Sequence, residues 1–199
     1  MIGLRIVNHD YINEVGDIKS GVSDMTEQRN MPEVIIKLWD DGDLGLLRQL
    51  NSPEMTVHFG GPETEEKILS RHKRYYEIAQ KGTGRMFKIL LLPQLEVVGS
   101  VGYWDQTWQG ESIYEIGWSV LPAFQGRGIA TEATAKAITS IKSEKKHRFI
   151  HAFPKINNPA SNAICRKLGF SWIDECDFEY PIGTIIRCND WRLTVGENE

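Results

Sequence analysis

The sequence has few cysteines, little net charge and no long apolar run. Its three cysteines are an odd number at spacings that match no metal-ligand motif, so neither a disulfide framework nor a metal site is indicated. A formal net charge of −4 argues against a broad nucleic-acid-binding surface. No apolar stretch could span a bilayer, and the start lacks a signal-peptide pattern. These absences predict a cytoplasmic protein with no membrane or nucleic-acid partner and no metal.

The composition that remains is ordinary for a globular protein. Hydrophobic residues make up 41% of the 199 residues and charged residues 25%, which is enough to build a core. This length favours one domain, alone or with an extension. Residues 1–32 are mixed and polar, so we predict an N-terminal extension there and one folded domain over residues 33–199.

Hydrophobic periodicity predicts an α+β fold. Three strand candidates follow one another closely, which is typical of an antiparallel meander. Amphipathic helical segments lie before and after them. The predicted strands are 34–39, 86–92, 96–104, 112–120, 148–153, 170–179 and 191–195, and the predicted helices are one beginning near 44 and three at 62–79, 130–146 and 158–168.

A glycine-rich segment, SVLPAFQGRGIATEA at residues 119–133, joins a predicted strand to a predicted helix. The first backbone N–H groups of a helix have no intrahelical partner, and they carry the positive end of the helix dipole. Gly126 and Gly128 would let an anion such as a phosphate approach these donors closely. The segment is not a dinucleotide fingerprint, since Thr131 replaces the third glycine. A tight turn without a ligand remains the alternative.

Two segments carry a resemblance to a known family. Residues 125–130, QGRGIA, resemble the Gln/Arg-x-x-Gly-x-Gly/Ala signature of the GNAT family of N-acetyltransferases. Residues 158–170, NPASNAICRKLGF, look like that family's second coenzyme-facing segment. Residues 114–118, YEIGW, are similar to the branch that includes the ribosomal-protein N-terminal alanine acetyltransferases. The resemblance covers about residues 34–195 and leaves residues 1–32 outside.

The resemblance implies a GNAT fold and acetyl-CoA as co-substrate. It implies a mixed, mostly antiparallel twisted sheet of about seven strands with about four helices, in which strands 112–120 and 148–153 splay apart to form the acetyl-CoA cleft. The loop amides would hold the pyrophosphate, and the strand end and second segment would hold the pantetheine arm. The implied coenzyme-binding residues are Val120, Leu121, Gln125, Gly126, Arg127, Gly128, Ile129, Ala130, Asn158 and Ser161.

Glu115 is our candidate for the general base. Acetyl transfer to an amine needs a neutral nucleophile, which a carboxylate with a raised pKa can generate. On a period of two, Glu115 shares a strand face with Gly117 and Ser119, whereas Tyr114, Ile116, Trp118 and Val120 form an apolar core face. A solvent-facing strand glutamate is the alternative interpretation.

Ser161 has two possible roles. Its hydroxyl could support the start of its helix, or it could donate a proton to the departing thiolate of coenzyme A. Many members of the family that this chain resembles use a tyrosine as this acid, often in the helix after the second motif. Here that helix has Ile164, Cys165 and Arg166, so Ser161 or water is left for the role.

Other aromatic and histidine residues are weaker candidates. Trp104 and Trp108 lie near a predicted strand end and could line the pocket for the acceptor amine. His58 could also contact the acceptor. His58 and His151 could each act as a base, although a lone histidine more often serves packing or lies on the surface.

We therefore predict an acetyl-CoA-dependent N-acetyltransferase in which a primary amine attacks the thioester directly. The acceptor could be a protein N-terminus or a small molecule such as a polyamine. A non-catalytic acyl-CoA-binding regulatory module is the alternative. The protein is expected to be a monomer or a homodimer.

Overall fold

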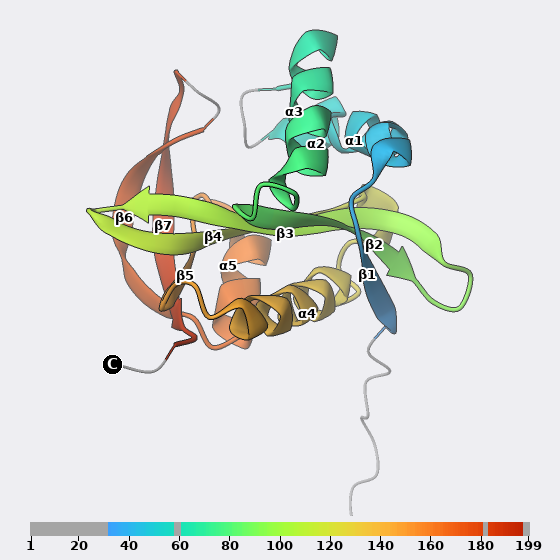
Figure 1. Cartoon of the computed structure of the whole chain (residues 1–199). Coiled ribbons are helices and arrows are strands. Elements are labelled where there is room, and N and C mark those ends of the chain that lie inside the picture. Colours follow the sequence, from blue (N-terminus) through green and yellow to red (C-terminus); the bar gives the residue numbers. More distant parts are fainter. Residues whose placement is uncertain (1–31, 58–60, 181–182, 197–199) are drawn as a thin grey trace, which may run out of the picture. The chain divides into compact units, whose positions relative to one another are not determined.

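Seven strands form one sheet in the computed structural model, which describes residues 32–57, 61–180 and 183–196 (Figure 1). The strands are β1 (Val34–Leu38), β2 (Gly84–Leu91), β3 (Glu96–Trp108), β4 (Glu111–Val120), β5 (Phe149–Ala152), β6 (Ser171–Glu179) and β7 (Ile185–Thr194). Their order is β1-β2-β3-β4-β5-β7-β6. Only the β4–β5 pair is parallel among these strands. The predicted α+β fold with a mostly antiparallel sheet is confirmed.

Helices cover both faces of the sheet. On one face lie α1 (Leu44–Leu50), α2 (Pro53–Thr56) and α3 (Glu65–Ile78), and on the other lie α4 (Ile129–Glu144) and α5 (Pro159–Lys167) (Figure 1). The side chains of Ser52, Thr64 and Asn158 cap the starts of α2, α3 and α5. About four helices were predicted. The unpredicted α2 is only one turn long, too short for a periodic pattern.

Each face of the sheet has its own hydrophobic core. The core under α1 and α3 consists of Trp39, Leu46, Leu47, Leu50, Ile68 and Met86. The larger core lies between the sheet and α4, and it includes Phe87 and Ile89. Met86 and Phe87 thus serve opposite cores, as the alternation of side chains along a strand requires.

Two strands extend further than the sequence predicted. β3 continues to Trp108, whereas the predicted strand ended at residue 104. The turn is only Gln109 and Gly110, both with positive φ (50° and 84°), as a two-residue hairpin needs. β7 begins at Ile185 instead of residue 191, because buried Ile186 and Cys188 alternate with exposed neighbours on this strand.

The parallel strands β4 and β5 splay apart, as predicted. They pair only at Tyr114 with Ile150 and at Glu115 with His151. β4 continues to Val120 while β5 ends at Ala152, and residues 116–120 have no pairing partner on β5. The divergence opens the sheet beside the glycine-rich loop.

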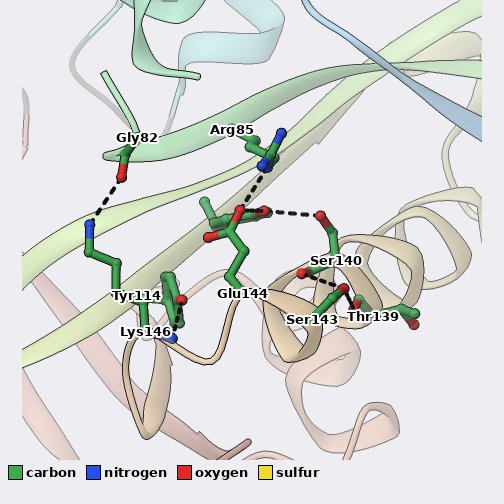
Figure 2. Close-up of polar contacts among 9 residues, drawn as sticks. Gly82, Arg85, Tyr114, Thr139, Ser140, Ser143, Glu144 and Lys146 are labelled. Carbon is green, nitrogen blue, oxygen red and sulfur yellow. Dashed lines mark hydrogen bonds and ion pairs between the residues drawn. The ribbon is translucent and has the colours of Figure 1, made fainter. Parts of the chain in front are cut away.

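A polar network fixes the C-terminal end of α4 against the sheet (Figure 2). Glu144 Oε1 accepts hydrogen bonds from Tyr103 Oη and from Arg85 Nε, both at 2.7 Å. Just beyond the helix, the backbone N–H of Lys146 donates to Tyr114 Oη at 3.1 Å. Because α4 is held at this end, its opposite end has a defined position beside the end of β4.

The predicted extension, residues 1–32, lies almost entirely outside the described residues, so its boundary stays a prediction. In the part of the chain that the structure covers, no helix combines the length and apolar character that crossing a membrane requires. Within that same part, no cluster of three or more His, Cys, Asp or Glu side chains is arranged to hold a metal ion.

Candidate active site

A groove of about 550 Å³ lies between the end of β4 and the starts of α4 and α5. Most of the predicted coenzyme-binding residues line it, namely Val120, Gln125, Gly126, Gly128, Ile129, Ala130, Asn158 and Ser161. Leu121 and Arg127 do not. The fold therefore brings residues from the two sequence segments that were singled out, 125–130 and 158–170, to one groove.

The glycine loop has the backbone geometry of an anion site. Gly126 and Gly128 have φ of 73° and 84°, a region of backbone conformation that residues other than glycine rarely adopt. Gly128 is the N-cap of α4, and it supplies no side chain to cap the helix. A Cβ on Gly126 would meet nothing within 4 Å. The open approach and the uncapped start of a long helix fit the pyrophosphate of acetyl-CoA.

The remaining loop residues have structural contacts of their own. Gln125 Nε2 donates to the carbonyl of Val120 at 2.8 Å, which ties the loop to the end of β4. The backbone N–H of Leu121 donates to the carbonyl oxygen of Val98 at 2.9 Å, so this N–H already has a partner. Arg127 is exposed and lies over the ring of Phe124, 5.7 Å from its centroid.

Asn158 and Ser161 sit at the start of α5. Asn158 Oδ1 accepts a hydrogen bond from the backbone N–H of Ser161 at 3.1 Å, so Asn158 supplies the cap of this helix. The Ser161 hydroxyl makes no hydrogen bond to a described residue. It therefore does not support the helix through its hydroxyl, which was one of the two interpretations.

Sequence reasoning missed the structural importance of Asn162. Its side chain is buried, and its Oδ1 accepts from Trp191 Nε1 at 2.8 Å and from Asn189 Nδ2 at 2.7 Å. Its Nδ2 donates to the carbonyls of Lys155 and Asn158. This amide fixes the start of α5 against β7. Its place within the second motif was the only available signal.

A second cavity, of about 200 Å³, opens on the face of the sheet that carries α1, α2 and α3. It also receives residues from β6 and β7, including Phe178 and Ile186. The cavity and the groove share five lining residues, which are Met55, Trp118, Ser119, Asn158 and Ser161. The two hollows thus meet at the splay between β4 and β5, and Trp118, predicted as a core residue, faces both.

Glu115 lines this second cavity and is partly buried. Its Oε2 accepts hydrogen bonds from Trp104 Nε1 at 3.0 Å and from Gln106 Nε2 at 3.3 Å. Burial raises the pKa of Glu115 above its ordinary value, and the two hydrogen bonds oppose this in part. A carboxyl group in this setting can accept a proton near neutral pH more readily than an exposed glutamate.

Trp104 lines the cavity as well as holding Glu115. A Cβ on Gly117 would lie 3.3 Å from Cη2 of the Trp104 indole, so the bare backbone of Gly117 makes room for this ring. Trp104 and Glu115 are register partners on β3 and β4. The predicted face of Glu115, Gly117 and Ser119 therefore positions an indole N–H beside the carboxylate.

Trp108 and His151 lie behind the cavity and are not among its described lining residues. Trp108 Nε1 donates to Asp190 Oδ2 at 2.9 Å, and His151 Nδ1 lies 2.6 Å from Asp190 Oδ1. The Trp108 ring contacts Phe153 and Phe178, which do line the cavity. His58 lies outside the described residues.

The side chains that close the cavity opposite β4 were not predicted. Asn51 from the end of α1, Glu63 before α3, and Arg71 and Tyr75 on α3 all line it. They come from three separate segments and form no sequence motif, so only the folded chain brings them together.

Comparison with known proteins agrees with this architecture. A ribosomal-protein-S5-alanine acetyltransferase from Vibrio fischeri superposes with a TM-score of 0.69 at 15% identity, over 83% of this chain and 95% of that one. A Salmonella typhimurium acetyltransferase that modifies the N-terminal serine of a 50S ribosomal subunit protein gives 0.66 at 19% identity, over 81% and 95%. A Vibrio cholerae spermidine N-acetyltransferase, solved with CoA and spermine, gives 0.65 at 16% identity, over 81% and 95%. At these identities the likeness establishes the fold.

A family described as "Acetyltransferase (GNAT) domain" matches residues 33–171. This match covers the glycine loop, the splayed strands and the start of α5, and it spans well over half of the chain. The chain therefore belongs to the GNAT acetyltransferase family.

Proposed function

We propose that Glu115 is the general base of this acetyl-CoA-dependent N-acetyltransferase, and that the amine acceptor enters the cavity of about 200 Å³. The observation that carries the proposal is the position of Glu115. Its carboxylate is partly buried, has a raised pKa and lines a cavity that meets the coenzyme groove. A base and a coenzyme site that open onto one another are what acetyl transfer requires.

Bound in the groove, acetyl-CoA supplies an activated acetyl group and a thiolate leaving group. The backbone N–H groups from Gly126 to Ala130 would hold the pyrophosphate, because α4 begins there without a side-chain cap. Leu121 N–H is used by Val98, so we expect the pantetheine arm to follow the backbone of Trp118 and Ser119, which line the groove.

In this proposal Glu115 removes a proton from the acceptor ammonium group through a water molecule, which leaves the amine free to attack the thioester carbon. Trp104 and Gln106 fix the carboxylate by binding Oε2. Their hydrogen bonds also hold the pKa below the value that burial alone would produce. The base is thus positioned before the acceptor arrives.

Ser161 is proposed to donate its hydroxyl proton to the departing thiolate. It lines both the groove and the cavity, and its hydroxyl is not engaged by a described residue. A water molecule at the same place is the alternative donor. The role of Asn158 would be to hold the arm, since it also lines both hollows.

The acceptor belongs to the primary amines. The similar structures include enzymes that act on a protein N-terminus and one that acts on spermidine, and the proposal covers both acceptor types. A cytoplasmic location is part of the proposal, supported by three free cysteines at residues 165, 176 and 188.

The experiment is a thiol-release assay with acetyl-CoA and a panel of amines, with the acetylated product identified by mass spectrometry. We expect stoichiometric thiol and acetyl-amine from at least one acceptor. Acetyl-CoA should also raise the unfolding midpoint by mass action. A midpoint shift with no product from any amine would support the non-catalytic binding module instead, and no shift at millimolar acetyl-CoA would contradict both.

A further inference from the structure

The acceptor cavity contains an ion pair that the proposed chemistry does not use. Arg71 Nη2 lies 3.0 Å from Glu63 Oε2, and the two side chains are only 13% and 21% exposed. Both residues line the cavity that contains Glu115. Burying two charges costs desolvation that their mutual attraction does not reliably offset. A role in binding substrate would explain why the ion pair lies in the lining of this cavity.

The pair is incompletely hydrogen-bonded. Glu63 Oε2 and Arg71 Nε are buried atoms, and neither has a hydrogen-bond partner among the described residues. The 3.0 Å contact between Arg71 and Glu63 is therefore an ion pair without hydrogen-bond geometry. A buried donor and a buried acceptor that stay unpaired cost free energy. These two atoms themselves have almost no accessible surface, so a ligand in the cavity would meet the exposed parts of the same guanidinium and carboxylate groups.

The surrounding structure fixes the backbone of Glu63 and places Arg71 on the cavity side of α3. Asn51 accepts from the backbone N–H of Glu63 at 2.9 Å through Oδ1, and its Nδ2 donates to the Glu63 carbonyl at 3.0 Å. Asn51 is buried. Arg71 and Tyr75 are four residues apart on α3, so they project from the same side of the helix into the cavity. The fold thus brings a donor group and an acceptor group to the same part of the cavity wall.

The charge of the cavity favours one class of acceptor. Its described lining has two carboxylates, Glu63 and Glu115, and two cations, Arg71 and Lys155. A polyamine carries several ammonium groups, and a lining without excess negative charge does not balance them. An amide carries no charge and presents one carbonyl acceptor and one N–H donor, which matches a guanidinium donor and a carboxylate acceptor side by side in the cavity wall.

We propose that Arg71 and Glu63 recognise an amide group adjacent to the reacting amine. Arg71 donates to the amide carbonyl, and Glu63 accepts from the amide N–H. The acceptor is then an α-amino amide, the group found at the N-terminus of a peptide. This inference rests on the proposed function and specifies its acceptor.

The first test compares acceptors with the wild-type enzyme. Alanine N-methylamide has both the carbonyl and the N–H, whereas alanine methyl ester keeps the carbonyl and a weakly basic amine but lacks the N–H. With rates expressed per neutral amine, kcat/KM should be about 10- to 100-fold higher for the amide, the scale of one hydrogen bond to a charged group. Spermidine should be a poorer acceptor than the amide. Equal kcat/KM for amide and ester would overturn the inference.

The second test removes the pair. Arg71→Met with Glu63→Met replaces it with side chains of similar length, a change that folded proteins often tolerate. The matched control is Arg48→Met with Glu65→Met, an exposed ion pair between α1 and α3 whose members do not line the cavity. The cavity variant should lose the preference for amide over ester, and the control should keep it.

These outcomes separate the inference from the proposed function. A folded cavity variant that kept the wild-type preference would show that the pair is only structural, and would overturn the inference. If that variant does not fold, the wild-type comparison of amide with ester decides alone. Wild-type enzyme that acetylates no amine would instead contradict the proposed function.

Discussion

The groove proposed for the coenzyme and the cavity proposed for the acceptor are built from different parts of the chain. In the groove, the main proposed contacts are backbone N–H groups at the start of α4, bared by Gly126 and Gly128. In the cavity, side chains from α1, α3, the middle of β4 and the β6–β7 pair form the lining. A backbone site can be encoded in one short segment, whereas a side-chain site depends on distant segments meeting.

The difference should also separate binding from chemistry. The two hollows share a boundary at Trp118, Ser119 and the start of α5. Away from that boundary, a substitution in the groove should weaken coenzyme binding, and one in the cavity should change turnover or acceptor choice. Each prediction below tests this separation.

The largest effect is expected for Glu115→Gln. The substitution keeps the size of the side chain and a carbonyl oxygen that Trp104 can bind, but it removes the base. Turnover at neutral pH should fall by about 10²- to 10³-fold, the usual scale for losing a general base. Acetyl-CoA affinity, measured by calorimetric titration, should be unchanged, and a matching loss of affinity would show that the two sites are not separate.

Gly128→Val should produce the second largest effect, in the groove. A β-branched side chain at the N-cap of α4 would occupy the approach of the pyrophosphate, so acetyl-CoA affinity should fall by about tenfold or more. The backbone strain at a positive φ is controlled by Gly110→Val, because Gly110 has the same φ of 84° in the β3–β4 turn and has open space around it.

Both valine variants should lose stability by a similar amount, measured as the fall in the unfolding midpoint, and only Gly128→Val should lose coenzyme binding. Arg127→Ala should change affinity by less than about threefold, since the side chain is exposed and surface charges contribute little. Equal affinity in the two valine variants would mean that the loop is only a turn.

Ser161→Ala is expected to have a smaller effect on turnover, about tenfold, because water can replace the hydroxyl as proton donor. The helix should remain stable, since Asn158 supplies its cap. The measurements are kcat with acetyl-CoA as the acetyl donor and the unfolding midpoint. An unchanged kcat would assign the thiolate proton to water.

The smallest effect concerns stability and pH. The pKa of Glu115 is raised by folding, so the folded protein keeps a proton that the unfolded chain releases. This contribution to stability is present below the unfolded pKa, about 4.3, and is lost as the pH rises through the folded pKa. Glu115→Gln should therefore unfold at a higher temperature than wild type near neutral pH. The difference should shrink toward pH 4, and a constant difference would argue against a raised pKa.

The two regions also differ in how well they could be predicted from the sequence. The proposed anion site of the groove depends on consecutive residues, so the spacing of Gly126 and Gly128 before a helix indicated it without further structure. The splay of β4 from β5 agreed with the expected fold. By contrast, the predicted end of β3 at residue 104 placed Gln106 in a loop, which hid its hydrogen bond to Glu115.

Most of the cavity lining could not be derived, because apart from Glu115 and Trp104 its parts have no local pattern. Glu63 and Arg71 are charged residues, a type usually found on the protein surface. Their burial results from the packing of α1 and α3 over β2. Trp108 was named as a candidate pocket residue, but its contacts with Phe153, just after β5, and with Phe178 on β6 follow only from the fold. Such sites follow from tertiary contacts alone.

The claim that Glu115 is the base is tested most directly by the pH dependence of kcat/KM for wild type and Glu115→Gln with one identified acceptor. The account predicts that wild-type activity falls on the acidic side with an apparent pKa above the ordinary range of glutamate. In Glu115→Gln that limb should be lost, and activity should recover only as higher pH supplies neutral amine. The same acidic limb in both proteins, with equal rates at pH 7, would contradict the account.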